Sequence, residues 1–452
     1  SAGLSVMYSL LAESSRGVGT AWPVGGNKVA RSGVNAKRGY IDRPGSRLVR
    51  LHSRQSAPLP LRAVCMDVTD LRVALVSGNY DMVRDGPTQA LNRLVGHVLD
   101  SGGAVRIFAP TVKNPQVDAV GEVISLPSVA IPGRSEYRIP LGLFGEAKEK
   151  FEEFRPNLVH VASPDRASRQ AVDWARKNGV PVLASVHTRF ETYPRYYKLG
   201  FLEPAVEAWL RAMYRKASAL VAPSEGMVDV LKAQRMHEDI GIWTRGIDRS
   251  IFHPGARDMA WRREQGIADD EVVISFLGRL VMEKGLDIFA DTIIELRKRQ
   301  VPHRVMVIGD GPARGWFEKA LPGGIFVGLQ AGQDLGRAVA SSDVFFNPSI
   351  TETFGNVTLE AMACGLPVVA SRGGGPRAII EDGRTGYLIP WHCPEPFAQR
   401  IDILLANPAL RESMGRAAMA SAQTMGWSRV AGRMTELYDS LVGQTWQNAA
   451  GA

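Results

Sequence analysis

The pattern of apolar and polar residues changes period repeatedly along the chain, starting at Leu71. Short, continuous apolar runs predict buried strands, and the segments between them repeat their apolar residues at the spacing of amphipathic helices. In the first half we expect a helix at 86–101 and strands at 71–77, 105–109, 158–161, 182–186 and 219–222. Strands that alternate with helices predict a doubly wound α/β domain.

This alternation stops near 243–254 and starts again at residue 272. Further strands are expected at 272–278, 305–309, 325–328, 344–346 and 367–371, which predict a second α/β domain of similar size. Open parallel sheets bind ligands beyond the carboxyl ends of their strands, so two such domains facing each other would form one cleft. An amphipathic helix is expected at 427–441.

The most informative segment is 349–370, where Glu352 and Glu360 stand on either side of a glycine turn. The apolar run before it ends in proline and predicts a buried strand. A turn is expected at 352–355 and a helix at 356–364, because a glycine and a proline would stop the helix there. The free N–H groups of a first helical turn and the helix dipole favour a bound anion. The alternative is a pair of surface glutamates beside a core helix.

Charged residues and glycines follow other strands of the second half. Arg279 and Lys284 come just after the strand at 272–278, where a guanidinium and an ammonium could neutralise a diphosphate. The alternative is solvated surface charge. Glycines at strand ends would let a ligand approach the backbone; they are Gly278, Gly309, Gly311, Gly328 and the run Gly373 to Gly375. The sequence contains no Asp-X-Asp motif that would hold a metal.

Two features of the first half point to the same kind of site. Gly86 closes a glycine-bearing loop after the first strand, and His187 ends the strand at 182–186. A lone histidine is more often structural, but this one ends a strand that faces the predicted cleft, so we expect it to contact a ligand. The aromatic and basic segment 190–198 follows, and it would suit an acceptor, a membrane headgroup region or a packed loop.

From about Leu71 to Leu441 the chain resembles glycosyltransferase family 4, whose members are retaining enzymes of the GT-B fold. The segment from Glu352 to Glu360 is similar to the family's E-x7-E signature, and 276–285 is similar to its G-R-L-x-x-x-K-G motif. The stretch 243–254 resembles the interdomain R-G-V-D…F-x-P link. The loop before Gly86 matches only in part, because an aspartate replaces one of the usual paired glycines.

The resemblance implies two facing Rossmann-like domains with a cleft between them. The expected divisions are a leader at 1–65, an acceptor domain at 66–245, a nucleotide-sugar donor domain at 246–426, and a helix and tail at 427–452 that cross back to the first domain. By pattern alone, that last helix could also be a plain surface helix.

The resemblance also implies roles for individual residues. Glu352 would hold sugar hydroxyls and Glu360 the ribose, while Arg279, Lys284 and the helix start would stabilise a departing diphosphate. The catalytic candidates are His187, Arg279, Lys284 and Glu352. The donor-binding candidates are Gly86, Gly278, Gly309, Gly311, Gly328, Thr353, Phe354, Gly355, Asn356 and Glu360. A nucleotide-diphosphate sugar is expected as co-substrate, with no metal or other cofactor.

The residues of these motifs are most similar to those of GDP-mannose-dependent α-mannosyltransferases and of enzymes that glycosylate diacylglycerol. We therefore expect a hexose, α-mannose from GDP-mannose, to be transferred to a lipid or lipid-linked glycan. Transfer from a UDP-sugar to diacylglycerol, a nucleotide-sugar epimerase and a non-catalytic sugar-nucleotide sensor remain open alternatives. The apolar and basic stripe at 202–216 would suit an anionic membrane surface as partner, or a core-facing helix.

The net charge of +8 is not evenly distributed. Residues 1–65 hold ten Lys or Arg and two Asp or Glu, so the remainder has 44 residues of each sign and no bulk attraction to nucleic acid. The leader is rich in Ser, Gly and Arg and has no sustained apolar period, which predicts disorder. It could be an Arg-rich transit peptide, but a natural start at Met66 is the plainer interpretation. The three cysteines, Cys65, Cys364 and Cys393, show no metal spacing. We expect a cytoplasmic enzyme that is peripheral on the inner face of the membrane.

Overall fold

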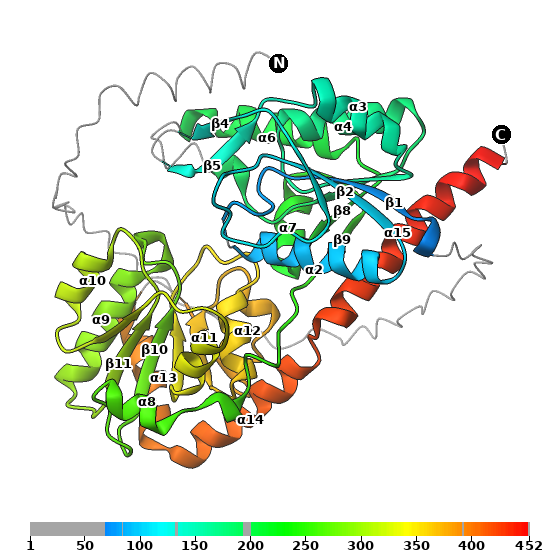
Figure 1. Cartoon of the computed structure of the whole chain (residues 1–452). Coiled ribbons are helices and arrows are strands. Elements are labelled where there is room, and N and C mark those ends of the chain that lie inside the picture. The colour runs from blue at the N-terminus through cyan, green and yellow to red at the C-terminus, as the bar shows by residue number, and fades with distance from the viewer. Residues whose placement is uncertain (1–67, 84, 132–133, 193–199, 391–392, 451–452) are drawn as a thin grey trace, which may run out of the picture. The chain divides into compact units, whose positions relative to one another are not determined.

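The computed structural model describes residues 68–83, 85–131, 134–192, 200–390 and 393–450 (Figure 1). The predicted leader at 1–65, the start at Met66 and most of the segment 190–198 lie outside these residues.

The first sheet is parallel throughout and has seven strands in the order β3-β2-β1-β6-β7-β8-β9. Its strands are β1 (Arg72–Val76), β2 (Ala104–Ala109), β3 (Glu122–Ser125), β6 (Leu158–Val161), β7 (Val182–Ser185), β8 (Ala219–Ala222) and β9 (Ile240–Ile242). The helices of this part are α2 (Gly86–Asp100), α3 (Gly145–Phe154), α4 (Arg166–Lys177), α6 (Glu203–Tyr214) and α7 (Glu225–Ala233). A short antiparallel hairpin, β4 (Ser128–Ile131) and β5 (Arg134–Pro140), lies outside the sheet.

The second sheet is also parallel, with six strands in the order β12-β11-β10-β13-β14-β15. Its strands are β10 (Val273–Leu277), β11 (Arg304–Ile308), β12 (Ile325–Gly328), β13 (Val344–Asn347), β14 (Val368–Ser371) and β15 (Gly386–Ile389). The helices are α8 (Met259–Glu264), α9 (Leu286–Lys298), α10 (Arg314–Ala320), α11 (Gly332–Ala340), α12 (Asn356–Ala363), α13 (Pro394–Ala406) and α14 (Pro408–Gln423). The prediction of two parallel α/β domains is therefore confirmed.

Both sheets are covered on their two faces, which explains why their strands read as continuous apolar runs. Along β1, Val73 and Leu75 pack in one core cluster with α2, while Ala74 and Val76 pack in the other with α3, α4 and α6. Neighbouring residues alternate between the two faces because the side chains of a strand have a period of two. β9 was not predicted because this edge strand is short and Ile242 is 47% exposed.

The last helix, α15 (Trp427–Ala450), packs against α2 and β6 of the first sheet. Val430, Met434 and Val442 are buried in the same core cluster as Leu71. Tyr438 is also buried there, and its hydroxyl lies 2.6 Å from Nδ1 of His160. The other ring nitrogen of His160 lies 2.8 Å from the hydroxyl of Ser185, so both nitrogens of this buried histidine have partners.

Candidate functional site

The carboxyl ends of β10, β11 and β12 are joined by their glycines. The N–H of Gly278 donates to the carbonyl of Ile308 at 3.0 Å, and the N–H of Gly309 donates to the carbonyl of Gly328 at 2.8 Å. A Cβ on Gly309 would lie 2.0 Å from the carbonyl oxygen of Gly278, so this approach requires glycine. Gly311 is equally constrained, because its Cβ would lie 2.5 Å from the carbonyl oxygen of Leu280. The predicted glycines thus form one backbone edge, in which Gly309 is buried and Gly278, Gly311 and Gly328 are partly buried.

The turn that carries Glu352 is held by the loop after β14. The N–H of Gly375 donates to the carbonyl of Glu352 at 2.7 Å, and a Cβ on Gly374 would lie 2.1 Å from that oxygen. The glycines at 373–375 therefore let two backbone segments touch, in addition to any approach by a ligand. Gly355 has a left-handed φ of 97° and precedes α12 without a side-chain cap. The first N–H groups of α12 are consequently left for an anion.

Lys284 and Glu352 form an ion pair although they are 68 residues apart in the sequence. The Nζ of Lys284 lies 2.7 Å from Oε1 of Glu352, and both side chains are largely shielded, at 28% and 16% exposed. The hydroxyl of Thr351 also donates to the carbonyl of Glu283 at 3.3 Å, so the loops after β10 and β13 are joined at two points. Arg279 lies in the same loop as Lys284 and is exposed.

The two glutamates of the signature have different environments. Burial, and secondly the charge of Glu352, raise the pKa of Glu360 to about 7. Glu352 faces a cation, whereas no ion pair to Glu360 is present in the described part of the chain. Near neutral pH, Glu360 therefore exists as a mixture of protonated and ionised forms, which can respectively donate or accept a hydrogen bond.

Two segments of the first domain contact the start of α12. The hydroxyl of Ser224, the N-cap of α7, donates to the carbonyl of Thr353 at 2.7 Å. A Cβ on Gly86, the first residue of α2, would lie 2.4 Å from Nδ2 of Asn356. The amino termini of α2, α7 and α12 therefore meet, and their dipoles add positive potential at one place.

His187 follows β7 and is buried at 5% exposure. Its Nδ1 lies 2.8 Å from Nη2 of Arg245, and the ring of Trp243 packs edge-on with a centroid separation of 5.2 Å. Burial, and secondly the charge of Arg245, hold the pKa of His187 well below its usual value. The sequence motif around Trp243 was assigned to a linker, and nothing in its spacing indicated a contact with His187.

The predicted site residues thus fall into groups. Lys284, Glu352 and the start of α12 lie together with Gly86, and the strand-end glycines lie together. Among the described residues, no hydrogen bond or ion pair joins His187 to either group, and its only charged hydrogen-bonding partner is Arg245. Phe354 is buried in the core of the second domain, at 3% exposure, so its side chain supports the turn from beneath.

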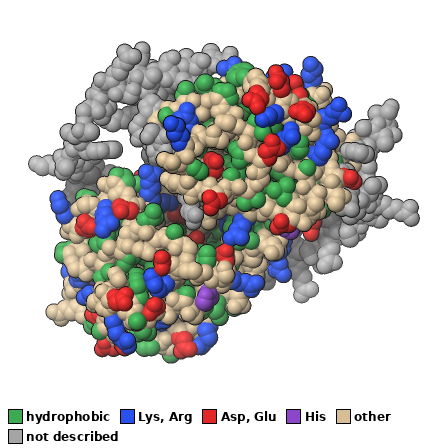
Figure 2. Space-filling model, in the orientation of Figure 1, with side chains coloured by type: hydrophobic (Ala, Val, Ile, Leu, Met, Phe, Trp, Pro, Cys, Tyr) green, Lys and Arg blue, Asp and Glu red, His purple; other side chains and the backbone are tan. Residues whose placement is uncertain are grey.

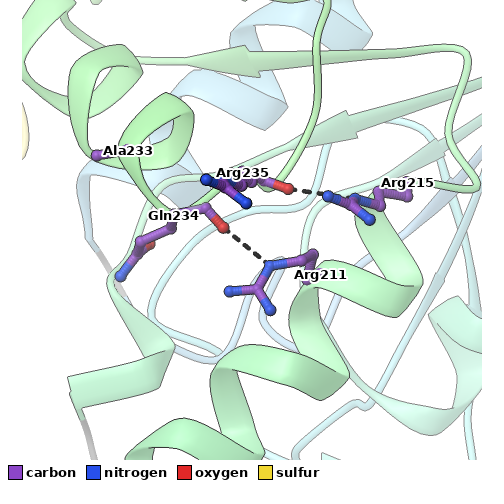
Figure 3. Close-up of a pocket in the computed structure, with 5 residues that line it drawn as sticks. All are labelled: Arg211, Arg215, Ala233, Gln234 and Arg235. Atoms are coloured by element: carbon purple, nitrogen blue, oxygen red, sulfur yellow. Dashed lines mark hydrogen bonds between the residues drawn. The ribbon is translucent and has the colours of Figure 1, made fainter.

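The stripe at 202–216 is divided between core and surface. Leu210, Met213 and Tyr214 are buried in the first domain, so that part of the membrane-facing interpretation is wrong. On the outer side, Arg211 and Arg215 line a hollow of about 450 Å³ together with Arg235 and the neighbouring residues of α7 (Figure 3). The Nε of Arg211 donates to the carbonyl of Gln234 at 2.9 Å, and that of Arg215 to the carbonyl of Arg235 at 3.2 Å. The hollow lies at the end of α7 opposite to Ser224.

Three further properties concern the side-chain clusters, the helices and the surface. Within the described ranges, no group of three or more His, Cys, Asp or Glu side chains is arranged to hold a metal ion. The helices of the described residues include none with the length and apolar character needed to span a bilayer. Figure 2 shows basic and acidic side chains interspersed over the visible face.

Comparison with known proteins gives consistent matches to both halves of the chain. Residues 85–251 match the family described as Glycosyltransferase Family 4, and residues 271–407 match the family described as Glycosyl transferases group 1. The GDP-mannose-dependent alpha-mannosyltransferase of Mycolicibacterium smegmatis is 30% identical over 389 residues, which cover 84% of this chain and 100% of that protein. The sulfoquinovosyl transferase SQD2 of Arabidopsis thaliana is 32% identical, covering 76% of this chain and 68% of that protein.

Solved structures share the same architecture. The sucrose-phosphate synthase of Thermosynechococcus elongatus superposes with a TM-score of 0.68 at 20% identity, covering 82% of this chain and 99% of that one. At this level of identity the similarity shows the fold, which is GT-B.

The coupling between the two glutamates can be tested directly. Replacing Glu352→Gln removes one of the two causes that raise the pKa of Glu360, so that pKa should fall toward the usual value for glutamate. Carboxyl ¹³C NMR titration, with the signal assigned from Glu360→Gln, measures it. Glu381→Gln, at an exposed carboxylate, is the matched control and should leave the titration unchanged. An unaltered midpoint in Glu352→Gln would contradict the coupling.

Proposed function

Since this chain belongs to glycosyltransferase family 4, we propose that it is a retaining hexosyltransferase that transfers α-mannose from GDP-mannose to a lipid or lipid-linked glycan. The chain is a glycosyltransferase, and the choice of mannose rests on one observation. The α-mannosyltransferase from Mycolicibacterium smegmatis aligns over its full length at 30% identity. We further propose the division into an acceptor domain at 66–245, a donor domain at 246–426, and a returning helix and tail at 427–452.

The diphosphate of the donor would lie at the start of α12. A departing nucleoside diphosphate gains negative charge, and donors fixed in advance stabilise that charge without reorganising. The uncapped N–H groups of α12 supply such donors, and Arg279 and Lys284 supply cations from the loop after β10. The ion pair with Glu352 supports this role, because it holds Lys284 in place before substrate binds. The convergence of α2 and α7 on the same point adds further positive potential.

The sugar and nucleoside would extend from this point in two directions. Glu352 would bind sugar hydroxyls, and Glu360 the ribose hydroxyls. The row formed by Gly278, Gly309 and Gly328 would let the nucleoside lie against backbone groups, which explains why the side chains do not identify the base. A retaining reaction would pass through an oxocarbenium-like state, with front-face attack by the acceptor as the diphosphate leaves.

A second candidate function is transfer of another hexose to a glycerolipid. The 32% identity to the sulfoquinovosyl transferase of Arabidopsis thaliana favours it. Family membership favours either transferase over the epimerase and the non-catalytic sensor. An epimerase would convert the donor in the absence of any acceptor, which distinguishes it from both.

A panel of nucleotide sugars tests the donor. GDP-mannose at 100 times its Kd should stabilise the protein by about 2.7 kcal/mol, because a ligand that binds only the folded state stabilises it by RT ln(1 + [L]/Kd). Thermal shifts with GDP-, UDP- and ADP-sugars measure this, and mass spectrometry of a lipid extract incubated with the preferred donor detects transfer. Stabilisation by UDP-sugars alone would overturn the choice of mannose, and product without acceptor would favour the epimerase.

Replacing either cation should slow the reaction. In Arg279→Ala and in Lys284→Ala, kcat/KM should fall by an amount equivalent to about 2–4 kcal/mol, the cost of removing one donor that stabilises developing charge. Lys298→Ala, at a lysine that is 69% exposed on α9, is the matched control and should retain full activity. Equal kcat/KM in Lys284→Ala and the parent would refute the assignment.

We also propose that the protein binds anionic membrane at the cytoplasmic face, through the hollow of Arg211, Arg215 and Arg235. The hollow gathers three guanidinium groups, and no hydrogen bond or ion pair to the guanidinium of Arg235 is present in the described part of the chain. Phe201, just before α6, is 74% exposed and could enter the interface.

Binding to vesicles measures this contribution. Arg215→Gln and Arg235→Gln should each cost about 1 kcal/mol of membrane affinity at low salt, roughly fivefold in Kd. Arg416→Gln, on the exposed side of α14, is the control. Sedimentation with phosphatidylglycerol vesicles is the measurement, and failure of the parent protein to bind them would remove the membrane part of the proposal.

A further inference from the structure

Arg245 is a buried cation that makes no ion pair among the described residues. It is 3% exposed and lies in the segment after β9. Its Nη1 donates to the carbonyl of Trp243 at 3.2 Å and to that of Thr244 at 3.5 Å, and its guanidinium carbon lies 5.3 Å from the centre of the Trp243 indole ring. Burying a charge is costly unless its donors are used. The remaining polar contact of its side chain is therefore informative, and it is directed at His187.

The chemistry of that contact determines where the proton of His187 lies. A guanidinium can only donate hydrogen bonds. Burial lowers the pKa of Arg245 to about 10, opposed by the charge of Asp85, so the group remains charged at neutral pH. Since Nη2 donates to Nδ1 of His187 at 2.8 Å, that nitrogen must offer its lone pair. The proton of the neutral ring then lies on Nε2.

The other ring nitrogen is ready for a ligand. Nε2 of His187 is buried and has no hydrogen-bonding partner among the described residues, and the same is true of Nε1 of the adjacent Trp243. Two neighbouring buried donors without acceptors are unfavourable in the free protein and become satisfied when an acceptor oxygen enters. The two rings pack edge-on, so the donors belong to one aromatic wall.

From this geometry we infer that Arg245 is a positioning residue that fixes the Nε2–H tautomer of His187, so that His187 donates a hydrogen bond to an oxygen atom of the bound sugar. The tautomer follows from the contacts alone, whereas the sugar as acceptor rests on the proposed function. His187 then cannot accept a proton at Nε2, because that nitrogen already carries one, and Arg245 occupies Nδ1. His187 is therefore a fixed hydrogen-bond donor and not a general base.

The surroundings of His187 agree with this role. The charged or titratable groups that act on it are Arg245 and His160, and Asp85 acts on Arg245 in turn. His160 is itself held neutral, because burial lowers its pKa to about 3. The ring of His187 therefore has no carboxylate partner that would favour an imidazolium.

Long-range ¹H–¹⁵N correlation spectra of ¹⁵N-histidine-labelled protein read the tautomer without any substrate. His187 is assigned as the signal missing in His187→Gln. We expect the Nε2–H pattern in the parent protein and in Arg245→Lys, which keeps a cationic donor. In Arg245→Met the signal should become a mixture of tautomers, and the pKa of His187 should rise, although burial still holds it below the usual value for histidine.

Steady-state kinetics provide the second readout. Arg245→Met should lower kcat by about ten- to a hundredfold, by analogy with the loss seen when a residue that orients a metal-binding histidine is removed. Its loss of rate should become smaller at low pH, because the imidazolium always carries a proton on Nε2, and Arg245→Lys should recover most of the rate and remove this pH dependence. A change of stability alone would not move the pH profile.

The possible outcomes separate the inference from the function on which it rests. An Nδ1–H or imidazolium pattern in the parent protein overturns the inference. This spectrum of the parent protein can be recorded even if Arg245→Met does not fold. An unchanged Nε2–H pattern in a folded Arg245→Met overturns it as well. Absence of transfer from every nucleotide sugar, with the tautomer as expected, would overturn the proposed function and leave the role of Arg245 intact.

Discussion

Direct contact between backbone segments at the carboxyl ends of parallel strands is the constraint on which this site depends. Parallel strands present their ends at one edge of a sheet, and the loops that leave them must pass within van der Waals distance. A Cβ on Gly309 would lie 2.0 Å, and one on Gly374 would lie 2.1 Å, from a carbonyl oxygen of the neighbouring loop. Glycine is thus required for the packing of the protein itself, before any ligand is considered.

This packing brings the charges of Lys284 and Glu352 together beside the start of α12. With the turn at Glu352 held from behind by Gly375, the carboxylate reaches Lys284, and α12 starts without a side-chain cap. A cation that is already paired loses less conformational freedom on meeting a substrate phosphate than a free surface lysine would. The pair also sets the environment of Glu360, whose raised pKa combines burial with the field of Glu352.

The two buried histidines of the first domain show how neighbouring hydrogen bonds separate structural from functional roles. His160 has a partner at each ring nitrogen, from Tyr438 on α15 and Ser185 on β7, so its hydrogen-bonding capacity is used within the fold. His187 has one partner, Arg245, and one nitrogen without any among the described residues. An unused donor in a buried position is unfavourable unless a ligand completes it.

Local sequence patterns were sufficient to predict many of the strands and helices of this protein. Apolar runs located β1, β6, β8 and β13, because a strand that is buried on both faces has a continuous apolar sequence. The end of α12 was equally clear, since Gly365 and Pro367 act on the backbone of their own neighbours. The strand β9 and the hairpin β4–β5 were missed, because a short edge strand and a half-exposed hairpin lack a continuous apolar run.

Only the tertiary structure decided which distant side chains meet. Lys284 and Glu352 are 68 residues apart, and His187 and Arg245 are 58 apart, so no spacing along the chain could reveal either contact. The apolar residues of the stripe at 202–216 repeat with a period that suits either a membrane-facing or a core-facing helix. Which of the two applies depends on the elements that pack against this helix. Leu210 and Met213 face the domain interior while Arg211 and Arg215 face outward, because the sheet covers one side of α6 and leaves the other to solvent.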